Sequence, residues 1–84
     1  MDIHYYARYC LRHCISCNDI IESGDLPRDI SLDEFKIQYR EMARKRLQRY
    51  KRYIDRKGIK PHTKNCYKSI IKFLENEVMS FEGY

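Results

Sequence analysis

Cysteine and histidine are the side chains of this 84-residue chain with the most distinctive chemistry. Cys10, Cys14 and Cys17 form a C-x3-C-x2-C pattern, and His62 precedes Cys66 by four positions. Thiolate and imidazole groups at such spacings are the usual ligands of structural zinc. A zinc site built from Cys14, Cys17, His62 and Cys66 is therefore one hypothesis for these residues.

The N-terminal cysteines also fit the apolar side of a helix. On a helical wheel of residues 3–22 they fall on the same face as aliphatic side chains. This face consists of Ile3, Ala7, Cys10, Cys14, Cys17 and Ile21. Because a free thiol packs as a small hydrophobic group, we favour core cysteines and expect no bound metal and no other cofactor.

A catalytic centre has few residues to build on. His4 and His13 are isolated, and Asp25, Asp29 and Asp33 lie where loops and helix caps ordinarily use aspartate. The sequence contains no Ser–His–Asp set, glycine-rich phosphate loop or H-E-x-x-H motif. A small ribonuclease using His, Tyr and Arg is the enzymatic alternative. We expect a protein that is not an enzyme and has no catalytic residues.

The densest chemical feature is the basic segment at residues 44–57. It holds eight Lys or Arg residues and one acid, a net charge of +7, whereas the whole chain carries +5. Such a density favours a polyanionic partner, and nucleic acid is the commonest one. The sequence predicts contacts to backbone phosphates with little sequence preference. The predicted contact residues are Arg40, Arg44, Lys45, Arg49, Lys51, Arg52, Arg56, Lys57, Lys60, Lys64, Lys68 and Lys72.

Four tyrosines are interspersed with these basic residues. They are Tyr39, Tyr50, Tyr53 and Tyr67. A ring beside a guanidinium can stack on a splayed base of single-stranded RNA or DNA. The alternative, favoured by a helical spacing shared with Phe35 and Met42, is packing in a core or a dimer interface. Arg46 falls inside the same apolar stripe, where it could snorkel, lie over a ring or face a ligand-filled groove.

Three amphipathic helices are predicted to position these groups. Their approximate ranges are 3–22, 32–57 and 62–79. Such helices joined by short loops imply an all-α fold, a three-helix bundle with a long basic central helix. We expect a single helical domain over residues 1–84 and, because so short a chain buries a small core, a homodimer.

Helix ends are signalled by local residues. Asp2 is the expected N-cap of the first helix, and Gly24 can adopt the left-handed conformation that ends it. Ser31 and Glu34 form a capping box at the start of the second helix. Gly58 fits the position just past the end of that helix.

No stretch approaches the roughly 18 apolar residues of a membrane span. The first residues do not have the basic start and apolar run of a signal peptide. We therefore expect a cytoplasmic protein with reduced thiols and no membrane partner.

The size, the Lys, Ile and Tyr bias and the basic region from Ser31 to Lys72 resemble the small early proteins of large lytic phages. Within that group the chain resembles phage RNA-binding inhibitors of ToxN-type host ribonuclease toxins. The resemblance implies an RNA-dependent antitoxin in the host cytoplasm that sequesters a host toxin, and it favours RNA over DNA. The alternative is a protein–protein inhibitor that docks its basic face on an acidic host enzyme surface without nucleic acid.

Overall fold

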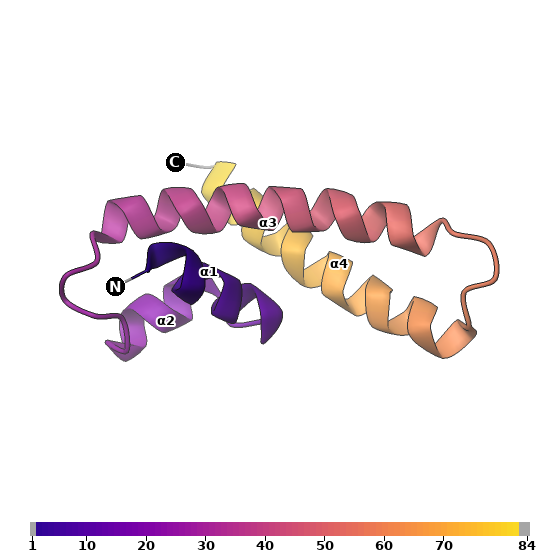
Figure 1. The fold of residues 1–84 in the computed structure, drawn as a ribbon, viewed down its shortest axis with the longest axis horizontal. Helices are drawn as coiled ribbons and strands as arrows, with labels where there is room; N and C mark the ends of the chain where they lie inside the picture. The colour runs from indigo at the N-terminus through magenta and orange to yellow at the C-terminus, as the bar shows by residue number, and fades with distance from the viewer. Residues whose placement is uncertain (1, 83–84) are drawn as a thin grey trace. The chain divides into compact units, whose positions relative to one another are not determined.

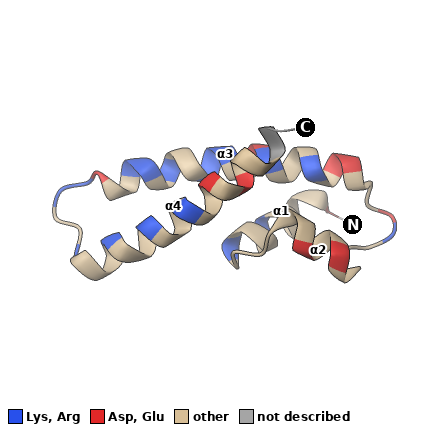
Figure 2. Cartoon of the chain, turned by 180° about the vertical axis from the view of Figure 1, so that it is seen from behind, with Lys and Arg blue, Asp and Glu red and all other residues tan. Residues whose placement is uncertain are grey.

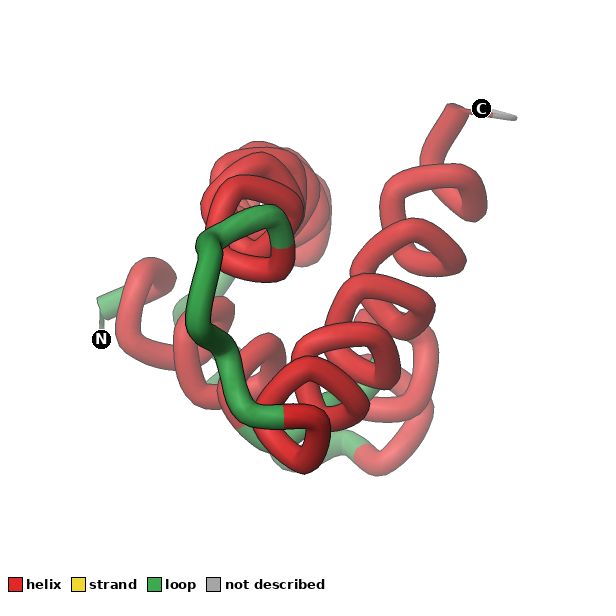
Figure 3. Tube along the Cα trace, turned by 90° about the vertical axis from the view of Figure 1, so that its right-hand side faces the viewer, coloured by secondary structure: helices red, strands yellow, loops and turns green. Residues whose placement is uncertain are grey.

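The described chain is all α-helical, as predicted. The computed structural model describes residues 2–82. These residues form α1 (Ile3–Arg12), α2 (Cys17–Ser23), α3 (Leu32–Ile54) and α4 (Pro61–Glu82) (Figure 1). Within this range every segment is helix or loop and none is a strand (Figure 3).

The predicted single helix over residues 3–22 is corrected to two helices, so four helices replace the predicted three. α1 ends in a Schellman motif: the Ile15 N–H donates to the Cys10 carbonyl at 2.8 Å, and the Cys14 N–H donates to the Leu11 carbonyl at 3.4 Å. The hydroxyl of Ser16 then caps α2 by accepting from the Asp19 N–H at 3.1 Å. Cys14 lies outside both helices and is exposed.

Cys14 occupies the position of this motif that glycine usually takes, with φ of 55°. A left-handed non-glycine residue costs roughly 1–2 kcal/mol, and the greater unfolded-state freedom of glycine offsets roughly 0.5–1 kcal/mol of that. We therefore expect Cys14→Gly to raise the free energy of unfolding by about 0.5–1 kcal/mol in urea denaturation. Cys14→Ala keeps the Cβ atom and should give no such gain; equal stabilities of the two variants would contradict this account.

α3 begins where the capping box predicts. The Ser31 hydroxyl accepts from the Glu34 N–H at 3.4 Å, and the flanking Ile30 and Phe35 are buried. α3 ends at Ile54, before the predicted end at residue 57, and Gly58 adopts a positive φ of 85° in the turn that follows. Pro61 is the first residue of α4, where its fixed φ suits a helix start.

The chain divides into two compact units, and the boundary lies within α3. Unit 1 is Met1–Met42 and unit 2 is Ala43–Tyr84. The buried side chains of unit 1 are Ala7, Cys10, Leu11, Cys17, Ile20, Ile30, Phe35 and Tyr39. The Tyr39 hydroxyl donates to the Ile15 carbonyl at 3.1 Å, which ties α3 to the connection between α1 and α2.

Unit 2 is a helical hairpin. Residues 43–54 of α3 and the whole of α4 run in opposite directions, joined by the turn at residues 55–60 (Figure 1). Its buried aliphatic side chains are Ala43, Leu74 and Val78. This hairpin contains most of the residues that the sequence singles out for binding.

Candidate nucleic-acid interface

Eleven of the twelve predicted contact residues lie in unit 2, and all eleven are exposed. The exception is Arg40, which lies in unit 1 and is half-buried. Its buried Nε has no hydrogen-bond partner among the described residues. A half-buried guanidinium is less able to reach a phosphate, so Arg40 is the weakest member of the predicted set.

Charge separates along the boundary between the units. Unit 1 contains five basic and eight acidic residues, a net charge of −3, whereas unit 2 contains twelve basic and four acidic residues, a net charge of +8. Lys and Arg crowd the end of α3 and the first part of α4, while Asp and Glu mark α2, the start of α3 and the later part of α4 (Figure 2). The positive potential of the chain therefore belongs to unit 2.

Three tyrosines hold the hairpin together. The Tyr50 ring centroid lies 5.4 Å from that of Tyr67 and 5.6 Å from that of Tyr53, and the Tyr53 and Tyr67 centroids are 6.0 Å apart. The two pairs of Tyr50 are edge-to-face and the Tyr53–Tyr67 pair is tilted by 41°. Aromatic pairs contribute about 0.5–1.5 kcal/mol each beyond area burial. We call Tyr50, Tyr53 and Tyr67 the tyrosine cluster.

Two arginines flank the tyrosine cluster. The Arg46 guanidinium carbon lies 5.2 Å from the Tyr50 ring centroid, and Arg46 Nη2 donates to the Tyr50 hydroxyl at 3.4 Å. The Arg56 guanidinium carbon lies 4.6 Å from the Tyr53 centroid. The sequence allows Arg46 to snorkel, to lie over a ring or to face a ligand-filled groove, and in the structure it lies over the Tyr50 ring.

The tyrosines are engaged with protein groups. The tyrosine-cluster rings contact one another and the two arginines, and Tyr39 is fully buried. Stacking on a nucleobase would require these rings to exchange their present partners. The packing interpretation therefore fits them better than a base-stacking platform.

A surface groove runs beside α4 in unit 2. Its volume is about 330 Å³, and it is lined by Ile54, Lys68, Ile71, Lys72, Glu75, Asn76 and Met79. The sequence prediction includes Lys68 and Lys72 but misses the rest of the groove. The apolar side chains of Ile54 and Ile71 could have indicated part of the groove. The residue types of Asn76 and Met79 do not indicate that they line it.

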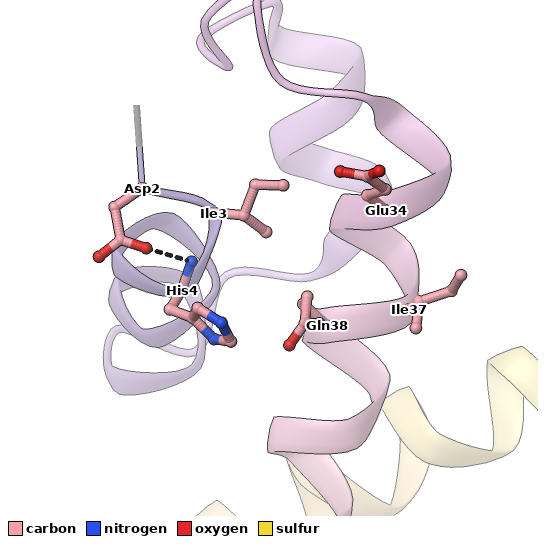
Figure 4. A pocket seen from close by; sticks show the side chains of 6 residues that line it. All are labelled: Asp2, Ile3, His4, Glu34, Ile37 and Gln38. Atoms are coloured by element: carbon pink, nitrogen blue, oxygen red, sulfur yellow. Dashed lines mark hydrogen bonds between the residues drawn. The ribbon is translucent and has the colours of Figure 1, made fainter.

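A second cavity lies in unit 1 (Figure 4). Its volume is about 450 Å³, and it is lined by Asp2, Ile3, His4, Glu34, Ile37 and Gln38. The Asp2 carboxylate accepts from the His4 N–H at 2.9 Å and so caps α1. His4 and Gln38 point toward each other from α1 and α3. The polar part of the lining consists of two carboxylates, one imidazole and one amide.

No family model, curated protein sequence or solved structure matches this chain. None of the helices within residues 2–82 combines the length and the apolar character needed to cross a bilayer.

The four cysteines lie in two different environments. Cys10 and Cys17 are buried, whereas Cys14 and Cys66 are exposed. The predicted apolar cysteine face is therefore correct for Cys10 and Cys17 and wrong for Cys14, because the helix ends before it. Burial raises the pKa of the Cys10 thiol, partly offset by a backbone hydrogen bond, and this favours the neutral form.

His62 and Cys66 are neighbours one turn apart on α4, with Nε2 and Sγ separated by 4.0 Å. Within residues 2–82 no three or more Cys, His, Asp or Glu side chains gather in a group that could hold a metal ion. A pair of side chains offers fewer ligands than the four of a structural zinc site.

Proposed function

We propose that this protein binds nucleic acid, with RNA favoured over DNA, through phosphates held on the basic surface of unit 2. The observation that carries this proposal is the gathering of eleven exposed predicted contact residues in a unit of net charge +8. Unit 1, with its net charge of −3, would add little to phosphate binding.

The mechanism follows from the ligand chemistry. Each phosphate that pairs with Lys or Arg releases condensed counterions, and this release drives binding. Arginine can also form two parallel hydrogen bonds to one phosphate, whereas lysine acts as a point charge. Phosphate contacts carry no base information, so sequence preference should be weak.

Affinity for RNA should fall steeply as salt is added. Each phosphate contact on a single strand contributes about 0.7 to the slope of log K against log salt concentration. If the protein contacts about four to eleven phosphates, the slope should be about −3 to −8. Fluorescence anisotropy with labelled RNA and DNA of the same sequence would measure this slope and the preference between them.

Failure to bind either nucleic acid at low ionic strength would overturn the proposal. A slope close to zero would do the same, because binding would then not depend on phosphate contacts. Binding that is equal for unrelated sequences is the expected outcome. A strong preference for one sequence would contradict the proposal that phosphate contacts dominate binding.

A further inference from the structure

The contacts of the tyrosine cluster define the two faces of the unit 2 hairpin. Tyr67 on α4 faces Tyr50 and Tyr53 on α3, at centroid distances of 5.4 and 6.0 Å. Residues are rotated by about 100° from one to the next along each helix. The two helices run in opposite directions. Residues that are turned away from the contact by the same angle, counted along each helix from its N-terminus to its C-terminus, therefore lie on the same side of the hairpin.

One side collects basic residues from both helices. We call it the lysine face, and it consists of Arg44, Lys51, Lys64, Lys68 and Lys72. All five side chains are exposed. On the opposite face α3 contributes Lys45, Arg49 and Arg52, and α4 contributes no basic residue but the acid Glu77. The lysine face also carries the acid Glu75, so its five basic residues and one acid give a net charge of +4, against +2 for the three basic residues and one acid of the opposite face.

The groove beside α4 opens on the lysine face. Its lining joins Ile54 of α3 to Lys68, Ile71, Lys72 and Met79 of α4, which independently supports the assignment of the faces. Ile54, Ile71 and Met79 make part of the groove apolar, and the Met79 side chain is 67% exposed. An apolar groove next to two ammonium groups suits a ligand that is part anion and part flat apolar ring.

We propose that the lysine face binds a single strand of RNA, with phosphates on Lys64, Lys68 and Lys72 and one splayed base in the groove. This inference rests on the proposed function and assigns its ligand and its face. Lys64, Lys68 and Lys72 are four residues apart and so advance about 6 Å from one to the next along α4. One extended strand can therefore follow them. The negative charge of Glu75 in the groove lining disfavours a phosphate there, while a neutral base is accepted.

A duplex fits this arrangement less well. Its bases remain stacked inside the helix, so the groove would stay empty, whereas unstacked bases of a single strand can be splayed out and bound at their edges. The exposed Asn76 amide in the groove lining offers both a donor and an acceptor to such an edge. The structure thus favours single-stranded over double-stranded RNA.

Two variants with equal charge change test the face. Lys64→Gln with Lys68→Gln and Lys72→Gln removes three charges from the lysine face, and Lys45→Gln with Arg49→Gln and Arg52→Gln removes three from the opposite face. The first should reduce the magnitude of the salt slope by about 2 and weaken single-stranded RNA binding on the order of a hundredfold at about 0.1 M salt. The second should lose less than about tenfold, through long-range charge alone.

Equal losses in the two variants would overturn the face assignment and leave the proposed function standing. If the unaltered protein binds no nucleic acid, the proposed function fails instead. Far-UV circular dichroism of both variants confirms that helix content is retained. All six substituted side chains are exposed, so folding should be little affected.

Met79→Ala tests the groove without changing charge. It should weaken binding of single-stranded RNA about tenfold, because an apolar contact with the base is lost, and leave binding of a duplex of the same length unchanged. Ile37→Ala, which shortens an exposed aliphatic side chain in unit 1, is the matched control. Equal losses for single and double strands, or tighter binding of the duplex by the unaltered protein, would overturn the single-strand assignment.

Discussion

Phe35→Ala should lower the free energy of unfolding by about 3–5 kcal/mol, because it removes buried apolar surface and leaves a cavity. Phe35 is fully buried in unit 1, and its ring centroid lies 6.0 Å from that of Tyr39. Small domains are stable by about 5–15 kcal/mol in total, so the loss is a large share. Urea denaturation followed by circular dichroism would measure it.

Ile37 provides the control on the same helix. It lies two residues after Phe35 and its side chain is 57% exposed, so Ile37→Ala should change stability by less than about 1 kcal/mol. Similar losses for the two alanine variants would show that Phe35 is not a core residue of unit 1.

Tyr67→Ala should destabilise unit 2 by about 3 kcal/mol. The ring is half-buried and forms two aromatic contacts, with Tyr50 at 5.4 Å and Tyr53 at 6.0 Å. Losing two such contacts costs about 1–3 kcal/mol, and the loss of partly buried ring surface adds a comparable amount. Thermal denaturation would measure the change, and RNA affinity should fall with it because the alignment of the two helices is lost.

Tyr67→Phe separates the ring from its hydroxyl. It keeps the aromatic contacts and should stay within about 1 kcal/mol of the unaltered protein. If Tyr67→Phe were as destabilising as Tyr67→Ala, ring packing would not be what joins α4 to α3.

The all-α class and several helix ends could be predicted because they depend on local rules. Asp2 and Ser31 accept N-terminal backbone hydrogen bonds, and Gly24 adopts φ of 73° at the end of α2. The break between α1 and α2 was missed because Cys14 carries no residue signal for a left-handed conformation. The Ser16 hydroxyl caps α2 by accepting from the Asp19 N–H, and the apolar periodicity of residues 3–22 does not reveal this second helix start.

From the sequence, the candidate site could be predicted only as a list of basic residues. Composition identifies which residues are basic, but it does not say which side of a helix faces a neighbour. That direction is fixed by the contact between Tyr50 and Tyr67, which are 17 residues apart in sequence. The division of the basic residues into two faces, and the groove beside Met79, therefore required the packed hairpin.

The chain contains eight tyrosines and no tryptophan. Near-ultraviolet optical activity arises from aromatic rings held in fixed asymmetric surroundings and is lost when packing loosens. The tyrosine cluster, with Arg46 and Arg56 over two of its rings, thus supplies unit 2 with a built-in chromophore. Ligand-induced reorientation of these side chains would be visible spectroscopically without any attached dye.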